Sequence, residues 1–131
     1  MNNQQLLIDL QNKAVLCVVD AVDFEWAYLL VNFEREVIDD EPGEDCLFVA
    51  FTRDNDEWKR QSVPLPAQCY DLFLQLASAM SRDGNALWGS CTLEVDSSGS
   101  YRFSFSYERP KRLNGDFGDE ALLKYYVPRP L

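Results

Sequence analysis

At 131 residues, 47% of them hydrophobic and 13% aromatic, the chain has the length and composition of one globular domain rather than a disordered segment. Its formal net charge of -10 argues against binding to nucleic acid or anionic lipid, because both are bound through their phosphates. The chain contains no histidine, which excludes Ser-His-Asp and Cys-His catalysis and mixed Cys/His zinc sites within it.

The N-terminal segment has the apolar spacing of an amphipathic helix that Asn2 or Asn3 caps and that runs to about Val22. A segment rich in aromatic and β-branched residues follows and predicts a strand. The residues expected to alternate on one face of that strand are Phe24, Trp26, Tyr28 and Leu30. The acidic stretch 34–45, which contains Pro42-Gly43, predicts a loop.

Further along the chain, residues 45–52 are apolar on both faces and predict a central strand, and residues 58–65 predict a third strand. The helical period predicts a second helix that begins near Pro66 and ends at Asp83-Gly84-Asn85. Residues 87–95 and 100–108 flank Asp-Ser-Ser-Gly and predict a hairpin with one buried and one solvated face.

The C-terminal part is turn-rich over 108–119, and Glu-Ala-Leu-Leu-Lys-Tyr-Tyr fits a short helix or an edge strand. Residues 127–131 predict a loose tail. The expected fold is therefore a single α+β domain over 1–131, with an antiparallel sheet of about five strands and helices packed on one face. Its predicted order is helix, three strands, helix and two strands, with one further C-terminal element left open.

The cysteines, Cys17, Cys46, Cys69 and Cys91, are widely spaced in apolar surroundings, which predicts buried free thiols rather than a disulfide framework or a metal site. The N-terminus lacks the basic-then-apolar order of a secretory signal, and no apolar run is long enough to span a membrane. Together these features predict a cytoplasmic protein.

Excess negative charge is confined to residues 1–57, which contain 14 acids and three bases, whereas residues 58–131 have a net charge of +1. Such a surface attracts basic proteins and speeds their association, although it also fits a merely solubilising role. We expect the acids of the predicted loop 34–45 and of the following turn at 54–57 to supply the charge that steers the partner, with Trp58 as an aromatic anchor. The candidate partner-binding residues are Glu36, Asp39, Asp40, Glu41, Glu44, Asp45, Asp54, Asp56, Glu57 and Trp58.

Other chemistries find weaker support. The carboxylate pairs Asp39-Asp40 and Asp54/Asp56 lack calcium-loop spacing, so no metal and no cofactor are expected. The aromatic residues of 101–107 fit a buried face better than a base-stacking platform, and the basic residues of 109–112 fit a solvated loop. With no glycine-rich phosphate loop and no activated nucleophile, the chain is not expected to be an enzyme.

The run from Ala86 to Pro110, with a Trp-led strand, a Gly-containing turn and an aromatic-rich strand, resembles the closing part of the YezG-like immunity protein family. Residues 24–36 and 45–51 are similar to its earlier aromatic strands. The resemblance implies a bacterial antitoxin that binds and neutralises the cognate toxin domain of a contact-dependent or polymorphic toxin system, often a nuclease. An acidic surface suits the basic cleft of such a nuclease.

Two alternatives remain open at this point. The predicted order of elements also describes type III secretion chaperones, which are dimers that bind an extended effector segment over apolar grooves. A third possibility is an acidic mimic of nucleic acid that acts on a DNA-binding protein.

Overall fold

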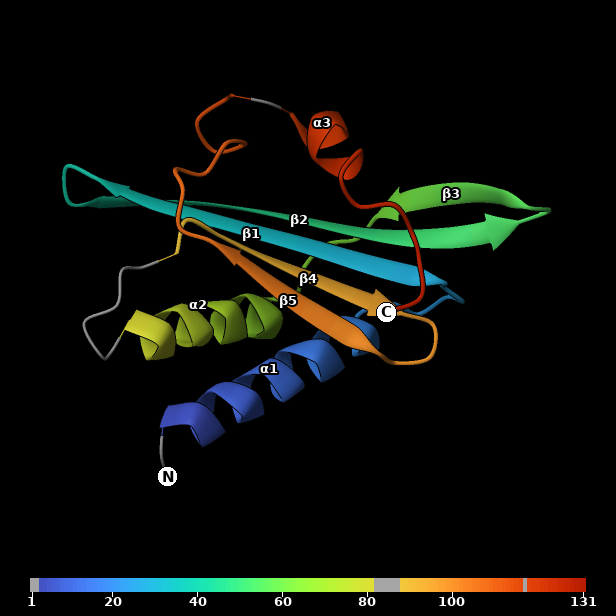
Figure 1. The fold of residues 1–131 in the computed structure, drawn as a ribbon, viewed down its shortest axis with the longest axis horizontal. Coiled ribbons are helices and arrows are strands. Elements are labelled where there is room, and N and C mark those ends of the chain that lie inside the picture. The colour runs from blue at the N-terminus through green and yellow to red at the C-terminus, as the bar shows by residue number, and fades with distance from the viewer. Residues whose placement is uncertain (1–2, 82–87, 117) are drawn as a thin grey trace.

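The computed structural model describes residues 3–81, 88–116 and 118–131. Its five strands form one antiparallel sheet in the order β3-β2-β1-β4-β5, which confirms the predicted α+β class (Figure 1). The elements are α1 (Asn3–Asp20), β1 (Tyr28–Ile38), β2 (Glu41–Asp54), β3 (Glu57–Ser62), α2 (Ala67–Ser81), β4 (Ser90–Asp96), β5 (Tyr101–Ser106) and α3 (Asp119–Leu123).

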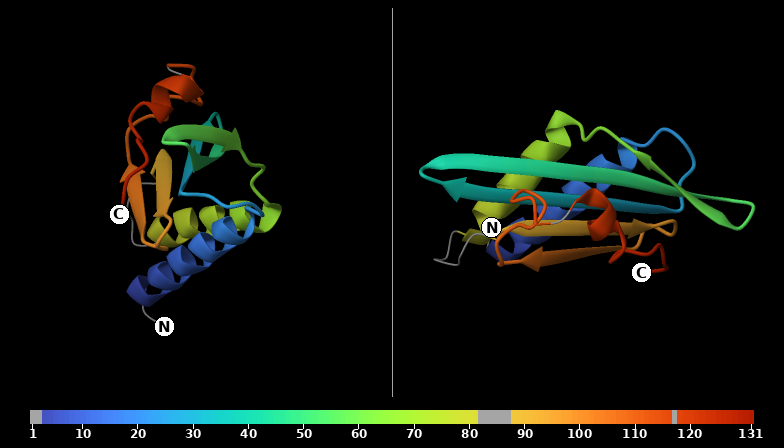
Figure 2. Two further views of the ribbon diagram at one scale, coloured as in Figure 1. Left: turned by 90° about the vertical axis from the view of Figure 1, so that its right-hand side faces the viewer. Right: turned by 90° about the horizontal axis from the view of Figure 1, so that it is seen from above.

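The helices α1 and α2 lie side by side on one face of the sheet, as predicted, whereas the short helix α3 lies on the opposite face (Figures 1 and 2). The predicted end of the second helix, Asp83-Gly84-Asn85, lies outside the described residues. Within the described part of the chain, no helix is both long and apolar enough to cross a membrane.

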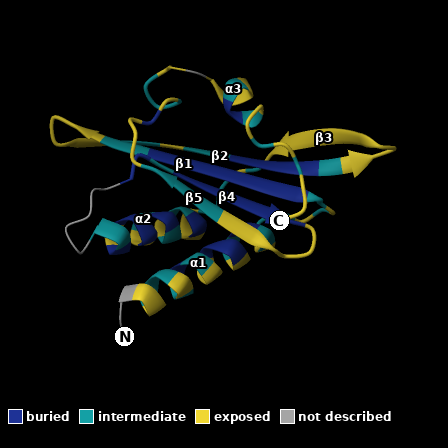
Figure 3. Cartoon of the chain, in the orientation of Figure 1, coloured by how far each residue is buried: buried dark blue, intermediate teal, exposed yellow. Residues whose placement is uncertain are grey.

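The main core fills the space between the sheet and the helices α1 and α2 (Figure 3). Strand residues two apart point to the same face, so alternate residues of β1 and β4 supply this core. The sheet contributes Leu29, Val31, Phe33, Phe48, Ala50, Cys91, Leu93 and Val95, and the helices contribute Leu10, Val15, Val18, Cys69, Phe73, Leu76, Ala77 and Ala79. Trp88 also belongs to this cluster, and its ring meets Phe33 edge to face.

The first strand begins four residues later than the aromatic pattern predicts, at Tyr28 instead of Phe24. Phe24 and Trp26 precede it and pack against the main core, whereas Tyr28 and Leu30 point to the opposite face. The expectation that these residues share one face of one strand is therefore wrong. Alternation persists only where backbone pairing holds the pleat, and β1 pairs with β2 and β4 from Tyr28 onward.

The acidic stretch 34–45 is not a loop, because β1 and β2 stay paired through it to the pair Ile38 and Glu41. Only Asp39 and Asp40 lie outside the strands, with φ angles of 52° and 65°. Two consecutive positive φ values define a type I′ turn, whose twist matches that of the flanking strands. Asp tolerates this left-handed conformation better than most residues, so a two-residue turn replaces the expected loop.

Residues 107–116 and 118–131, which we name the C-terminal strap, cross the face of the sheet opposite α1 and α2 (Figure 2). A second apolar cluster forms beneath the strap. It consists of Tyr28, Leu30, Val49 and Phe51, with Leu47 from β2 and Leu123 and Tyr126 from the strap packed against them. As a result β4 is buried on both faces, and the predicted solvated face of the β4–β5 hairpin is largely covered at β4.

The end of the strap also contacts the sheet, at positions where the sequence predicts a loose tail. Arg129 Nη2 lies 3.4 Å from Glu94 Oε1, and the backbone N–H of Leu131 donates to Asp96 Oδ2 at 2.6 Å.

A disulfide joins Cys17 of α1 to Cys69 of α2, which corrects the prediction of four free thiols. The two Cα atoms are 5.7 Å apart although the residues are separated by 52 positions in the sequence. The pairing depends on the packing of α1 against α2 and has no signature in the cysteine spacing. Cys46 and Cys91 are free thiols, as predicted.

Candidate functional site

The predicted partner-binding residues fall into two groups at opposite ends of the molecule (Figure 1). Residues 36–45 form the end of the β1–β2 hairpin, which we name the acidic hairpin. Residues 54–58 form the turn between β2 and β3 at the other end. The 14-residue strand β2 separates the two groups, so they do not form one continuous patch.

The acidic hairpin contains six acids and no base, and two aliphatic residues are exposed beside them. Val37 and Ile38 are each 53% exposed although they lie within β1. Because successive strand residues point to opposite faces, one aliphatic side chain lies on each face of the hairpin end. Apolar side chains surrounded by charge are typical of a protein-binding surface, and neither Val37 nor Ile38 is among the partner-binding residues predicted from the sequence.

Asp39, Asp40 and Glu41 are exposed and form no ion pair with any described residue. Half-buried Glu44 likewise has no ion-pair partner in the described ranges. Their negative field is therefore not neutralised locally, and a field of this kind attracts a positively charged partner.

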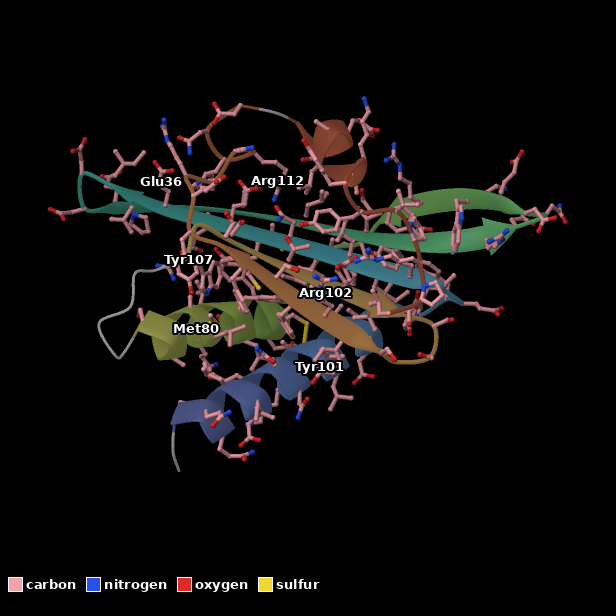
Figure 4. The ribbon with its side chains drawn as sticks, in the orientation of Figure 1. Glu36, Met80, Tyr101, Arg102, Tyr107 and Arg112 are labelled. Carbon is pink, nitrogen blue, oxygen red and sulfur yellow. A yellow bond between two sulfur atoms is a disulfide. The ribbon has the colours of Figure 1, made fainter. Side chains whose placement is uncertain are left out.

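Glu36 and Asp45 differ from their neighbours because the C-terminal strap binds both of them. Glu36 accepts a hydrogen bond from Asn114 Nδ2 at 2.7 Å and lies 3.6 Å from Arg109 Nε. Arg112 forms an ion pair and a short hydrogen bond with Asp45. These two acids thus help to hold the strap against the sheet. Figure 4 labels Glu36 and Arg112, one residue from each side of this contact region.

Arg112 is the central contact of the strap, and its side chain is only 3% exposed. Its guanidinium donates to Asn32 Oδ1 at 2.9 and 2.7 Å and lies 3.5 Å from Glu34 Oε2. Glu34 is 2% exposed and also accepts from the backbone N–H of Leu113 at 2.9 Å. The sequence predicts a solvated loop at Arg112, because one arginine in a turn-rich basic run carries no signal of burial.

A cleft of about 540 Å³ opens between the acidic hairpin and the strap. Glu36, Ile38 and Glu41 line it from the hairpin, and Leu113 and Asn114 line it from the strap. Its walls combine carboxylates with aliphatic carbon, which suits the apolar stem and charged head of a lysine or arginine side chain.

The second acidic group is largely compensated by neighbouring bases. Lys59 Nζ lies 3.0 Å from Asp54 Oδ2, and Arg53 Nη2 lies 3.7 Å from Asp56 Oδ1. Trp58 is 41% exposed, with the Arg53 guanidinium carbon 5.1 Å from its ring centroid. This end of the molecule therefore offers an aromatic surface of mixed charge.

A second cleft, of about 470 Å³, lies beside Trp58. It is lined by Trp58, Arg53, Ala27, Asp96, Ser97, Ser98, Pro128, Arg129 and Pro130.

Among the described residues, no three acidic or thiol side chains converge in a group able to hold a metal ion. Burial raises the pKa of the Cys46 thiol to about 12 and also raises the pKa of Cys91. Both thiols are therefore protonated at neutral pH, which suppresses their nucleophilicity.

Comparison with protein-family models finds none that matches the chain, and comparison with curated proteins finds no match either.

Proposed function

We propose that this protein is an immunity protein that binds and neutralises a cognate, basic toxin domain, with the acidic hairpin as its first point of contact. The observation that supports this proposal best is the uncompensated charge of Asp39, Asp40 and Glu41 beside the exposed Val37 and Ile38. Charge steers the encounter, whereas buried aliphatic contact lowers the dissociation rate. A toxin domain that binds nucleic acid is basic at its cleft and fits such a surface.

The two ends of the molecule provide a test of this assignment. Reversal of Asp39, Asp40 and Glu41 to lysine changes the charge by as much as reversal of Asp54, Asp56 and Glu57. Only the first set lacks local bases, so the hairpin variant should slow toxin association by about tenfold or more at low salt and flatten its salt dependence. The second variant is the matched control and should change the association rate much less.

The toxin is to be sought in the reading frame immediately upstream. Its C-terminal domain would be expressed in a sensitive host with and without this protein, and growth would be compared. Killing that this protein relieves, together with co-purification of the two chains, is the expected result. Absence of toxicity would reject the immunity role. If both charge-reversed variants still relieve toxicity and bind the toxin with unchanged association rates, the assignment of the acidic hairpin as the contact surface would be rejected.

A secretion chaperone is the second candidate, and an apolar groove on the helices favours it. The groove, of about 250 Å³, lies between α1 and α2 and is lined by Leu6, Leu10 and Leu74. Ile8 and Leu16 are also exposed on α1. A secretion chaperone should be a dimer that co-purifies with an intact secreted protein. Displacement of DNA from a DNA-binding protein that is not a toxin would instead favour the nucleic-acid mimic.

A further inference from the structure

The sheet face beneath the C-terminal strap is unusual because it buries carboxylates. Glu34, Glu94 and Asp96 lie there with 2%, 1% and 7% exposure, whereas the opposite face is built from apolar side chains. Acids are almost never fully buried unless a partner compensates them. Here the strap supplies partners, through Arg112 for Glu34, Arg129 for Glu94 and the Leu131 N–H for Asp96.

The strap is thus seated as an arginine-bearing segment on an acidic and apolar surface. Its arginines meet the carboxylates, and its Leu123 and Tyr126 pack on the cluster around Tyr28 and Leu30. Guanidinium groups above carboxylates and apolar side chains above an aliphatic strip are also the contacts that a basic protein segment would make.

The strap is separable from the rest of the fold. None of its residues joins the sheet ladders, and α3, with five residues, is its only helix in the described part of the chain. The main core lies on the other face of the sheet, between the strands and α1 and α2. Opening of the strap therefore leaves that core intact, as expected of a local unfolding unit.

We propose that the sheet face beneath the strap is a second partner surface, which accepts an arginine-bearing segment of the basic partner when the strap opens. The proposal rests on the proposed function for the basic character of that partner. The acidic hairpin connects the two surfaces, because its Glu36 and Asp45 hold Arg109 and Arg112 of the strap. A partner that binds these two acids competes directly with the strap.

Because the closed strap covers the sheet face, it weakens the binding of the partner's arginine-bearing segment there. The apparent affinity of the face equals its intrinsic affinity multiplied by the fraction of molecules whose strap is open, so variants that loosen the strap should bind a basic ligand more tightly. Removal of any positive charge from this protein should by itself strengthen the binding of a basic ligand, so the test needs a control variant that loses one positive charge without loosening the strap. Lys124 provides it, because it is exposed, belongs to the strap and forms no ion pair with any described residue.

The first experiment is hydrogen exchange of the full-length chain at increasing denaturant. Amides of Leu113, Leu122 and Leu131 should exchange through an opening whose denaturant dependence is smaller than that of global unfolding, because opening of the strap exposes only part of the buried surface. Amides of β1 and β4 should exchange only through global unfolding. Equal protection and equal denaturant dependence of both sets would show that the strap does not open separately, and would overturn the proposal.

The second experiment measures binding of a synthetic oligoarginine peptide to Arg112→Gln, Arg129→Ala and Lys124→Ala. Relative to Lys124→Ala, Arg112→Gln should bind about tenfold more tightly and Arg129→Ala roughly threefold, with amide shifts at residues 32–34 and 93–96. Arg129→Ala keeps the test available if Arg112→Gln does not fold. Equal affinities with shifts confined to residues 36–45 would overturn the proposal. Relief of toxicity is measured in a separate experiment, so the immunity function and the second partner surface can each be rejected without the other.

Discussion

At the scale of single residues, the buried polar groups of the strap-covered face distinguish this fold from a simple two-layer sandwich. Tyr28 is 1% exposed, and its hydroxyl donates to Glu94 Oε1 at 2.5 Å. Burial and this hydrogen bond raise the pKa of Tyr28 well above its ordinary value. Asp96 is stabilised in its charged form, because the Ser98 hydroxyl and the Leu131 N–H donate to it and lower its pKa.

We predict that Tyr28→Phe lowers the free energy of unfolding by about 1–3 kcal/mol, because it leaves the buried Glu94 carboxylate without its closest donor. Since the folded state holds the Tyr28 proton more tightly than the unfolded state does, wild-type stability should also fall as pH rises above about 10, and the variant should lose this part of the decline. Tyr101→Phe is the control, because Tyr101 is 40% exposed and its hydroxyl donates to the exposed Asn12 Oδ1 instead of to a buried carboxylate. Urea unfolding of the three proteins measures both effects, and equal losses in the two variants would contradict the prediction.

Asp96→Asn should flatten the acid side of the stability curve. The pKa of Asp96 is lower in the folded state, so its contribution is complete above the unfolded value of about 3.9 and is lost as pH falls through the folded value. Urea unfolding between neutral and strongly acidic pH should show wild type losing more stability than the variant. Parallel curves would mean that Asp96 does not contribute.

At the scale of elements, two-residue turns and close backbone contacts fix the sheet. Asp39-Asp40 and Asn55-Asp56 each have two positive φ values, so both hairpins of β2 close with type I′ turns. At the start of β4, Gly89 donates its N–H to Ser106 O at 2.8 Å. This contact brings the beginning of β4 against the chain that leaves β5.

Gly89→Ala should destabilise the fold by about 1–3 kcal/mol, because a Cβ at this position would lie 2.3 Å from the backbone oxygen of Glu108. The obstacle is backbone, so neither rotamer change nor a flexible side chain relieves it. Gly118→Ala is the matched control, since a Cβ there would meet no atom within 4 Å among the described residues beyond its chain neighbours. Thermal and urea unfolding should separate the two variants, and equal stability would show that the Gly89 contact is dispensable.

At the scale of the whole molecule, the layers are asymmetric. Two long helices, the disulfide and the larger core lie on one face, and an irregular strap clamped by polar contacts lies on the other (Figures 2 and 4). The long axis ends in two acidic turns. Bases pair with Asp54 and Asp56 at one end, whereas Asp39, Asp40 and Glu41 at the other form no ion pair with any described residue.

Cys17→Ser/Cys69→Ser should lower the free energy of unfolding by about 2–4 kcal/mol, because a cross-link between residues 52 positions apart restricts the unfolded chain. A thiol reductant should destabilise the wild type by a similar amount and leave the double variant unchanged. Urea unfolding with and without the reductant measures this, and a reductant effect that persists in the double variant would exclude the disulfide as its source.

The sequence by itself determined the kinds of element and much of their order. Period and turn chemistry were sufficient for α2 and for the β4–β5 hairpin, because those signals are local. Uniform apolarity likewise identified β2 as an interior strand. The same reasoning located the acids of the candidate site, since charge is visible in composition alone.

Only the tertiary structure decided which acids are free. Strand pairing extended β1 and β2 through a stretch whose residues favour a loop, and so moved Asp39 and Asp40 to a tip far from Asp54 and Asp56. The strap then bound Glu36 and Asp45 through residues more than 60 positions away. Contacts between distant segments depend on the packed arrangement of the whole chain, and neither residue type nor local spacing encodes them.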